Sequence, residues 1–331
     1  MNRKIIALSF AATLSFAATS SVASNADFSV ANEALKAGDI VAAEQVFTQL
    51  SKKDKASVPG QVLAGRLLLD KGDNEEAFEH FEALREDHAE NVEVNYYLGL
   101  SAVIMAQKAS IFSKLGYAED FLEAMEKTIA LQPDHIDALN TLIGFHLAAP
   151  SIAGGDTDKA LTYANQLKNI DAERGIEQLA NVYWQTEKAS LAEKTLQQGL
   201  IEFPESSPLY FTRATSYMKN KAWDKAREDL KLAIKYAPND KDKSRALYQQ
   251  GKTSAESGEE IELGISALSQ ALPLADEEYK PWIEYRLTQL HIHNKNFAKA
   301  KDSLSMINTS EDDDLKSKVK KLKKKLKKLS S

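Results

Sequence analysis

The chain has 331 residues, with 42 basic and 48 acidic side chains and a formal net charge of −6. It contains no cysteine, which excludes a disulfide framework, cysteine-based metal sites, thiol catalysis and a lipid anchor on an N-terminal cysteine. Residues 27–314 hold 31 basic and 48 acidic side chains, a net of −17, and this charge repels nucleic acid and anionic membranes at long range, whereas the nine lysines of residues 315–331 attract them. No nucleic-acid partner is expected, because residues 1–26 predict export.

The first 26 residues have the pattern of a secretory signal peptide. Two basic residues open the chain, residues 5–18 are apolar, and small residues supply candidate cleavage positions after Ala23 and Ala26. The apolar run is shorter than the roughly 20 residues that span a bilayer, and no other stretch predicts a transmembrane helix. We therefore expect an exported protein, and the absence of cysteine favours a bacterial periplasm.

The first part of the mature chain carries a turn signal followed by apolar residues. Gly72-Asp73 is followed by Ala77 and Phe81, and Gly38-Asp39 is followed by Ala43 and Phe47 at the same spacing. Steps of three and four residues place side chains on one face of a helix. Residues 58–91 therefore predict a pair of helices, with a similar half-repeat before them.

Two segments depart from this spacing. Between Gly99 and Gly116 there are about ten residues more than one repeat allows, and the apolar stretch Leu100–Leu115 predicts a longer first helix with about three extra turns. In residues 148–156, Pro150 and the Gly154-Gly155 pair predict a protruding loop. Each irregularity is either a functional insertion or a tolerated surface insertion, and both interpretations stay open.

The clearest regularity lies in residues 173–240, where a set of five residues recurs after 34 positions. Ala180, Tyr183, Ala192, Leu196 and Pro204 reappear as Ala214, Tyr217, Ala226, Leu230 and Pro238. Within the second copy, the chain predicts two helices separated by a break at Lys221-Ala222, and Pro238 ends the second helix. Small residues lie where the helices cross, because an alanine lets two helix axes approach closely. Neither helix buries its apolar stripe alone, so the repeats must stack.

These residues give the chain a resemblance to the tetratricopeptide repeat family. Repeats of that family span about 34 residues and show W-x2-L-G-x2-Y, a turn, A-x3-F and a closing Pro. Further matches are Leu98-Gly99, Gly116, Met125, Pro133, Gly251, Gly258, Gly264, Leu268, Ala271, Phe297, Ala300 and Leu304. The resemblance implies an all-α fold, a right-handed superhelical solenoid of about eight helix-turn-helix repeats over residues 27–309.

In this family the first helix of each pair lines a concave groove, and the residues one helical step away from the core stripe face it. The groove residues predicted on this basis are Tyr96, Leu100, Asn181, Trp184, Phe211, Met218, Tyr248, Trp282 and Tyr285. Aromatic anchors suit an extended peptide or a partner helix. The alternative is that some of these residues belong to the core. The carboxylate clamp of chaperone-binding members finds no match, so a C-terminal carboxylate is not the expected ligand.

Residues 310–331 predict an acidic cap followed by a lysine-rich amphipathic helix. Ser310 offers an N-cap, residues 311–314 give an acidic first turn, and Leu315, Val319, Leu322, Leu326 and Leu329 form one narrow apolar stripe. Three interpretations stay open: a solvating helix that covers the last repeat, a helix on an anionic lipid surface, or a clasp on the acidic body or another acidic polymer. The nine lysines are Lys316, Lys318, Lys320, Lys321, Lys323, Lys324, Lys325, Lys327 and Lys328.

No catalytic or cofactor-binding pattern stands out. The six histidines form no H-E-x-x-H motif, and neither G-x-S-x-G nor a phosphate-binding loop occurs. His291 and His293 are two residues apart on a predicted helix and so face different sides. We therefore expect no metal and no cofactor, and predict a non-catalytic periplasmic scaffold that binds protein or peptide segments in its groove. The alternatives are an envelope-surface adaptor attached through the lysine-rich helix and, least favoured, an enzyme with its site in an irregular repeat.

Overall fold

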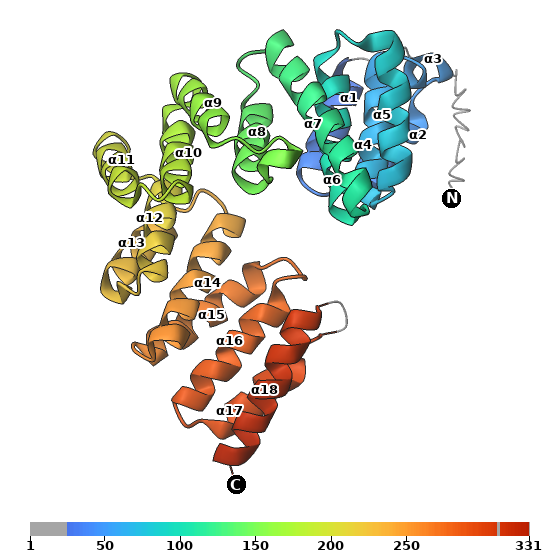
Figure 1. Ribbon diagram of the computed structural model, residues 1–331. Helices are drawn as coiled ribbons and strands as arrows, with labels where there is room; N and C mark the ends of the chain where they lie inside the picture. The colour runs from blue at the N-terminus through green and yellow to red at the C-terminus, as the bar shows by residue number, and fades with distance from the viewer. Residues whose placement is uncertain (1–24, 310–311, 331) are drawn as a thin grey trace, which may run out of the picture. The chain divides into compact units, whose positions relative to one another are not determined.

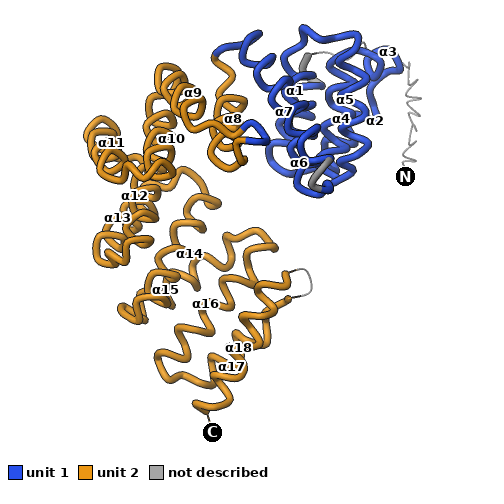
Figure 2. Tube along the Cα trace, viewed as in Figure 1, with its two compact units in different colours: residues 1–133, 152–154 blue, residues 134–151, 155–331 orange. Residues whose placement is uncertain are grey.

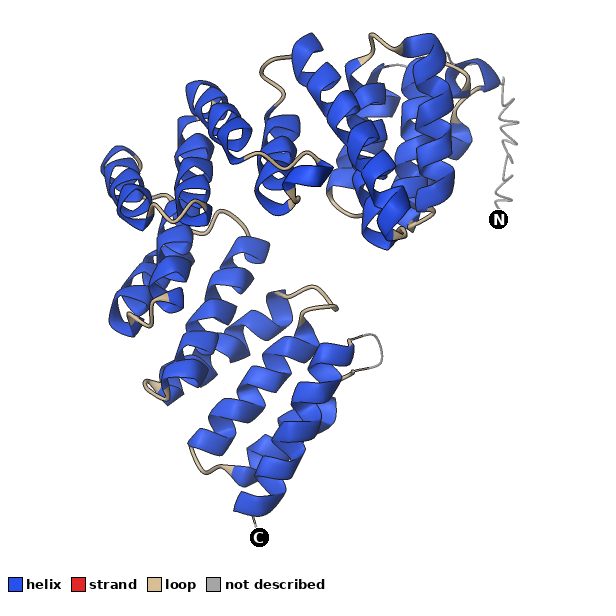
Figure 3. Ribbon diagram, viewed as in Figure 1, coloured by secondary structure: helices blue, strands red, loops and turns tan. Residues whose placement is uncertain are grey.

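The computed structural model describes residues 25–309 and 312–330, so the predicted signal peptide lies outside the described residues except for its last two. The described part consists of α-helices and two short 3-10 helices, without strands (Figure 3), which confirms the all-α prediction. No helix in it is both long and apolar enough to cross a membrane. The chain separates into two compact units (Figure 2): unit 1 is Met1–Pro133 with Ile152–Gly154, and unit 2 is Asp134–Ser151 with Gly155–Ser331.

Unit 1 is built from three helix pairs and one short extra helix (Figure 1). Its helices are α1 (Asn25–Lys36), α2 (Ile40–Gln49), α3 (Lys52–Lys55), α4 (Val58–Lys71), α5 (Asn74–His88), α6 (Val92–Lys108) and α7 (Ile111–Leu131). The first helices of the pairs are α1, α4 and α6, and α4 packs against both α1 and α6. Each pair therefore buries its apolar stripe against the next, as expected for stacked repeats.

Glycine at a fixed position of the first helix lets the second helix pack closely. A Cβ placed on Gly65 of α4 would lie 2.4 Å from the ring of Phe81, which is fully buried on α5. Gly99 of α6 has the same relation to Met125 of α7, with a Cβ at 2.9 Å. These contacts explain the glycine of the Leu98-Gly99 match and of the corresponding Ala64-Gly65 in α4, because a side chain at this position would hold the paired helices apart.

The prediction of a longer first helix over Leu100–Leu115 is wrong. Helix α6 ends at Lys108, Ala109 is extended, and α7 begins at Ile111 and runs for 21 residues. The break is local, because the Ser110 hydroxyl caps α7 by accepting a hydrogen bond from the Ser113 amide at 3.4 Å. The extra turns therefore belong to the second helix of this pair.

Unit 2 continues the paired arrangement. Its α-helices are α8 (Ile136–Ala148), α9 (Thr157–Ile170), α10 (Ala172–Gln185), α11 (Ala189–Glu202), α12 (Ser207–Lys219), α13 (Trp223–Lys235), α14 (Asp240–Ser257), α15 (Ile261–Ala271), α16 (Lys280–His293), α17 (Phe297–Met306) and α18 (Asp313–Leu329). The first helices form a row in which α8, α10, α12, α14, α16 and α18 each pack against the next. Helix α18 thus takes the place of the first helix of a further pair.

The 34-residue recurrence is confirmed as a core pattern. Ala180, Ala192 and Leu196 and their counterparts Ala214, Ala226 and Leu230 are all fully buried. The two tyrosines of the pattern, Tyr183 and Tyr217, are half-buried and pack against these clusters. The first helix of each pair therefore meets the second through alanine, and leucine fills the space beside it.

The predicted loop at residues 148–156 is confirmed. Helix α8 ends at Ala148, the 3-10 helix η1 occupies Ser151–Ala153, and α9 begins at Thr157. The amide of Gly155 donates a hydrogen bond to the Pro150 carbonyl at 3.1 Å, and a Cβ on Gly155 would lie 1.8 Å from the Ala149 carbonyl oxygen. Only glycine fits this close backbone approach.

Several turns between paired helices use a left-handed residue, but of different residue types. Glycine holds the position in three of them, with φ of 76° at Gly38, 86° at Gly72 and 75° at Gly258. Three turns of unit 2 instead have φ of 59° at Glu187, 57° at Lys221 and 56° at Lys295. Side chains with a Cβ are strained in this conformation, so these three turns carry a cost that the glycine turns avoid.

Candidate functional site

The row of first helices in unit 2 carries most of the predicted groove residues. Asn181 and Trp184 lie on α10, Phe211 on α12, Tyr248 on α14 and Trp282 on α16, and all five are half-buried. Each of the four aromatic side chains packs against an apolar cluster of its own pair while leaving part of its surface in solvent. This partial burial is the state expected of an aromatic anchor on a binding surface.

Two of the predicted groove residues belong to the core. Met218 is 8% exposed and packs with Ala214, Ala226 and Leu230. Tyr285 is also 8% exposed and packs against α18 through Leu315, Val319, Leu322 and Leu326. The alternative interpretation, that some of these residues are core residues, therefore holds for this pair.

Tyr96 and Leu100 lie on α6 in unit 1 and are half-buried. Tyr96 meets Tyr97 edge to face, with ring centroids 5.1 Å apart, and Tyr97 in turn stacks on Phe81 at 5.7 Å. The Arg66 guanidinium lies 5.0 Å from the Tyr97 ring centroid. Tyr96 therefore belongs to an aromatic cluster of unit 1, whereas the features described next belong to unit 2.

A cleft of about 430 Å³ opens between α12, α14 and α16, and we call it the α14 cleft. Two predicted groove residues, Phe211 and Tyr248, line it. The other lining residues are Lys241, Ser244, Arg245, Gln249, Leu274, Ala275, Asp276, Tyr279 and Ile283. Its volume lies within the range of small ligand pockets, about 300–1,000 Å³, which is room for a few side chains of a bound segment.

Charged side chains surround the apolar floor of the α14 cleft. The Arg245 guanidinium lies 5.0 Å from the Phe211 ring centroid, and Lys241 and Asp276 form an ion pair at 3.7 Å. Tyr279, on the loop before α16, is 55% exposed. These residues could not be predicted from sequence, because hydrophobic spacing identifies apolar faces and gives no signal for polar residues at their edge.

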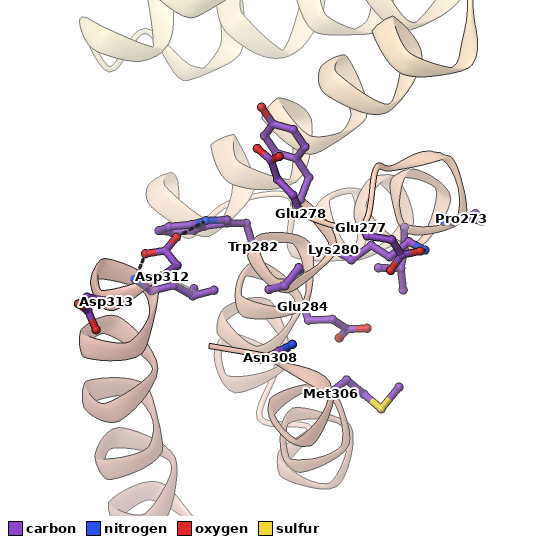
Figure 4. A pocket seen from close by; sticks show the side chains of 14 residues that line it. Pro273, Glu277, Glu278, Lys280, Trp282, Glu284, Met306, Asn308, Asp312 and Asp313 are labelled. Atoms are coloured by element: carbon purple, nitrogen blue, oxygen red, sulfur yellow. Dashed lines mark hydrogen bonds and ion pairs between the residues drawn. The ribbon is translucent and has the colours of Figure 1, made fainter. Parts of the chain in front are cut away.

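A larger pocket of about 1,140 Å³ adjoins α16 and α18 and shares Tyr279 with the α14 cleft. We call it the acidic pocket, because Glu277, Glu278, Glu284, Asp312 and Asp313 line it beside Lys280 (Figure 4). Figure 4 also shows the hydrogen bond from the Trp282 indole N–H to Asp312 Oδ2, at 3.0 Å. The ammonium of Lys318 lies 5.2 Å from the Trp282 ring centroid. Trp282 is thus held by α18 on one side of this pocket.

Two carboxyls near these surfaces have a shifted pKa. Burial raises the pKa of Glu284, and its hydrogen bond with Ser303 opposes the shift. Burial likewise raises the pKa of Glu177 on α10, against a hydrogen bond from the Thr212 hydroxyl at 2.9 Å and the nearby charge of Arg245. Both carboxyls have a hydrogen-bond partner on a neighbouring element, so they connect helices in unit 2.

The histidines predicted to face different sides lie at the end of α16. His291 is buried and His293 is exposed, and burial lowers the pKa of both imidazoles, with a further contribution from Lys299 at His291 and from Lys325 at His293. Among the residues that the structure describes, no group of three or more histidines and carboxylates is arranged to hold a metal ion.

The lysine-rich C-terminal helix forms as predicted, with its start shifted. The described N-cap of α18 is Asp312, whose Oδ1 accepts a hydrogen bond from the Leu315 amide at 2.8 Å, whereas the predicted cap, Ser310, lies outside the described residues. Leu315, Val319, Leu322 and Leu326 are 1–6% exposed and pack on α16 and α17. Leu329, the last residue of the predicted stripe, is 48% exposed. The apolar stripe therefore covers the last pair, as the first of the three interpretations expects.

A sequence profile of the tetratricopeptide repeat matches residues 62–104 and 177–244. A tetratricopeptide repeat protein from Parabacteroides merdae ATCC 43184 is similar in structure, with a TM-score of 0.54 and 16% identity over 80% of this chain and 97% of that one. The Cut9–Hcn1 hetero-tetramer of the APC/C contains a similar chain, with a TM-score of 0.50 and 16% identity over 88% of this chain and 55% of that one. A comparison with curated proteins finds no match. At these identities the structural likeness concerns the fold alone.

Proposed function

From the premise that the chain belongs to the tetratricopeptide repeat family, we propose that it is a non-catalytic scaffold that binds a protein or peptide segment through the first-helix row of unit 2. The α14 cleft is the observation that carries this proposal. It combines the two half-buried aromatic side chains Phe211 and Tyr248 with charged groups at its edge. Interfaces of this kind take an apolar anchor in the pocket and polar main-chain contacts around it.

The shape of the α14 cleft favours an extended or helical protein segment with one or two large apolar side chains. Tyr248 and Ile283 offer an apolar floor, while Arg245 and Lys241 can donate hydrogen bonds to main-chain carbonyls or to an acidic residue of the segment. Tyr279 projects at the border with the acidic pocket. A segment longer than the cleft would therefore continue toward the carboxylates of that pocket.

The proposal includes no catalytic step. The carboxyls with a raised pKa, Glu177 and Glu284, accept hydrogen bonds from Thr212 and Ser303. Neither is placed beside a nucleophile and a base in the described contacts, which is the arrangement that covalent catalysis uses. The irregular segments at residues 99–116 and 148–156 consist of helix, a short cap and a glycine loop, which favours a structural role for both.

We place this scaffold in a bacterial periplasm on the basis of the signal-peptide pattern in residues 1–26 and the absence of cysteine. The alternative function, in which the lysine-rich helix attaches the protein to an anionic lipid or polymer, does not compete with the groove proposal. The exposed lysines of α18 line neither the α14 cleft nor the acidic pocket, so both surfaces can act in one molecule.

The test is site-specific photocrosslinking in cells from position 279, with mass spectrometry of the captured proteins. Wild type is expected to capture a defined set of partners. The double variant Phe211→Ala/Tyr248→Ala should lose at least about tenfold in capture, since two central anchors each contribute 1 kcal/mol or more. The matched control is Tyr210→Ala/Tyr236→Ala, which removes two stacked, half-buried aromatics outside the cleft. If both double variants capture partners as well as wild type, the α14 cleft is not the binding site.

A further inference from the structure

Helix α18 has a charge pattern unlike that of the other helices in unit 2. From Leu315 to its end it carries nine lysines and no acidic residue, and every lysine except Lys318 is exposed. Helix α13, of similar length, alternates Asp224, Glu228 and Asp229 with Lys225 and Lys231. The exposed lysines of α18, which we call the lysine face, are Lys316, Lys320, Lys321, Lys323, Lys324, Lys325, Lys327 and Lys328.

Covering the last pair does not account for the lysine face. The cover is made by four apolar residues that are 1–6% exposed, and any mixture of polar residues would keep the outer side in water. Instead, lysines follow one another at four-residue steps, as in Lys316, Lys320, Lys324 and Lys328. Like charges at this spacing repel and destabilise a helix. The uniform sign therefore works against the fold unless an opposite charge is met elsewhere.

The protein itself supplies little of that opposite charge. Within the described part of the chain, Lys316 pairs with Asp313 at 3.9 Å and Lys318 pairs with Asp314, both at the start of the helix. Lys320, Lys321, Lys324 and Lys327 form no ion pair with a described residue. These four lysines thus remain available for an anionic partner.

We propose that the lysine face docks the protein on the surface of an anionic lipid bilayer, with α18 lying along the surface and its apolar residues remaining in the core. The helix has 17 residues, about 25 Å at 1.5 Å per residue, and its lysines project along that whole length. The acidic start of the helix keeps Asp313 and Asp314 at one end, so the C-terminal end approaches the surface more closely.

The mode of contact is electrostatic and excludes deep insertion of α18. Insertion would remove Leu315, Val319, Leu322 and Leu326 from their contacts with Tyr285 and Ile292, and so expose the last pair to water. Leu329 is the apolar side chain of the stripe that remains exposed, in the last turn among the lysines. It can enter the interfacial layer without disturbing the core.

A bilayer fits the lysine face better than an acidic polymer does. The exposed lysines lie on a single helix and line neither the α14 cleft nor the acidic pocket, so they offer no groove to hold a flexible chain, whereas a flat surface can meet them along the length of the helix. The face contains no arginine and no aromatic residue, the residue types that recognise phosphates in pairs or stack on bases. Lysine, a hydrated point charge, suits diffuse attraction to a charged surface.

The inference is independent of the α14 cleft and is tested on the whole chain by vesicle co-sedimentation. Vesicles of phosphatidylcholine are compared with vesicles that contain about 30% phosphatidylglycerol, at about 50 mM and about 500 mM NaCl. The test variant is Lys320→Gln/Lys321→Gln/Lys324→Gln/Lys327→Gln. The control variant is Lys168→Gln/Lys194→Gln/Lys219→Gln/Lys231→Gln, four exposed lysines on other helices of unit 2, so both variants have the same net charge.

Wild type and the control variant are expected to sediment with the anionic vesicles at low salt and to be released at high salt. The test variant should bind about six-hundredfold more weakly than wild type, since each of the four lysines contributes about a fivefold gain in partitioning. Glutamine is a good helix former, and far-UV circular dichroism checks that α18 persists. Equal sedimentation of the two variants overturns the proposal.

The wild-type protein alone also tests whether the partner of the lysine face is an anionic bilayer. Wild-type binding to anionic vesicles that is unchanged between low and high salt overturns the electrostatic mode. Wild-type binding to soluble polyphosphate, without sedimentation on anionic vesicles, overturns the bilayer as the partner and assigns the lysine face to a polymer. Salt-sensitive binding to anionic vesicles but not to neutral ones supports the proposal.

Discussion

The guanidinium of Arg213 on α12 donates two hydrogen bonds to the carboxylate of Asp229 on α13, from Nε and Nη2, each at 2.7 Å. Asp229 is almost fully buried, and Arg213 is partly covered by Tyr210 and Tyr217. The hydrogen bonds with Asp229 raise the pKa of Arg213. This pair joins the two helices of the repeat that supplies Phe211 to the α14 cleft.

Replacing Asp229 with alanine should therefore destabilise unit 2. The change leaves a partly buried guanidinium without its partner, which costs about 2–3 kcal/mol once the partial exposure of Arg213 is allowed for. The measurement is urea unfolding followed by circular dichroism. The control is Asp224→Ala, which removes an exposed carboxylate while its partner Arg227 keeps the ion pair with Glu259 at 3.0 Å, and it should change stability by no more than about 0.5 kcal/mol. Equal effects of the two substitutions would contradict this account.

Glycine at the left-handed turn residues of unit 2 should stabilise the protein, in contrast to the loss of Asp229. Glu187→Gly and Lys221→Gly should each stabilise the protein by about 0.5–1 kcal/mol, because glycine removes the strain of a positive φ and gives back part of the gain as chain entropy. Thermal unfolding measures the change. Lys231→Gly, an exposed position in the interior of α13, is the control and should destabilise by about 1 kcal/mol. Destabilisation by all three glycines would show that the turns are not strained.

Two helical glycines differ in the space available for a side chain. A Cβ on Gly251 of α14 would lie 2.2 Å from Leu268 Cγ, whereas a Cβ on Gly144 of α8 meets nothing within 4 Å. Gly251→Ala should cost about 1–3 kcal/mol through overpacking, and Gly144→Ala should stabilise by up to about 1 kcal/mol. The melting temperatures of the two variants should therefore shift in opposite directions, and a shared direction would refute the packing argument.

The raised pKa of Glu284 should make the free energy of unfolding depend on pH. Its pKa is raised by burial above the ordinary 4.5, so the folded state holds the proton over a pH range in which the unfolded state has lost it. The contribution of Glu284 to the free energy of unfolding is therefore fully present below the ordinary pKa. It is lost as pH rises through the raised pKa of the folded state. Glu284→Gln should raise the melting temperature at neutral pH and flatten the fall of the melting temperature as pH rises above 4.5. An unchanged pH profile would indicate that Glu284 is well solvated.

Much of the fold could be predicted from sequence because the signals are local. The alanine and leucine positions of the 34-residue recurrence, the Gly-Asp turns and the glycine loop before Asp156 each depend on the period of one helix or the φ angle of one residue. The prediction failed between Leu100 and Leu115 because the apolar run masks the helix break. The signal that could have found it is Ser110, a residue type that caps helices.

The candidate site could be predicted only in part. Phe211 and Tyr248 were found because they lie one helical step from the core stripe, but Met218 shows the same pattern and is buried. Whether such a residue faces solvent depends on where neighbouring helices cross, which its own helix does not determine. Arg245 and Lys241 carry no periodic signal, and Tyr279 lies on a loop, so all three emerged only with the α14 cleft.

Helix α18 shows which features follow from residue type and which follow from the packing of neighbouring helices. The helix, its apolar stripe and its excess of lysine could be predicted from residues 310–331, because they depend on residue type and a period of 3.6 residues. Whether the stripe is free for lipid or covered depends instead on how neighbouring helices pack. Leu315, Val319, Leu322 and Leu326 pack against α16 and α17, since burying apolar surface on a neighbouring repeat is available within the chain itself. The lysines remain outside because charge keeps its hydration.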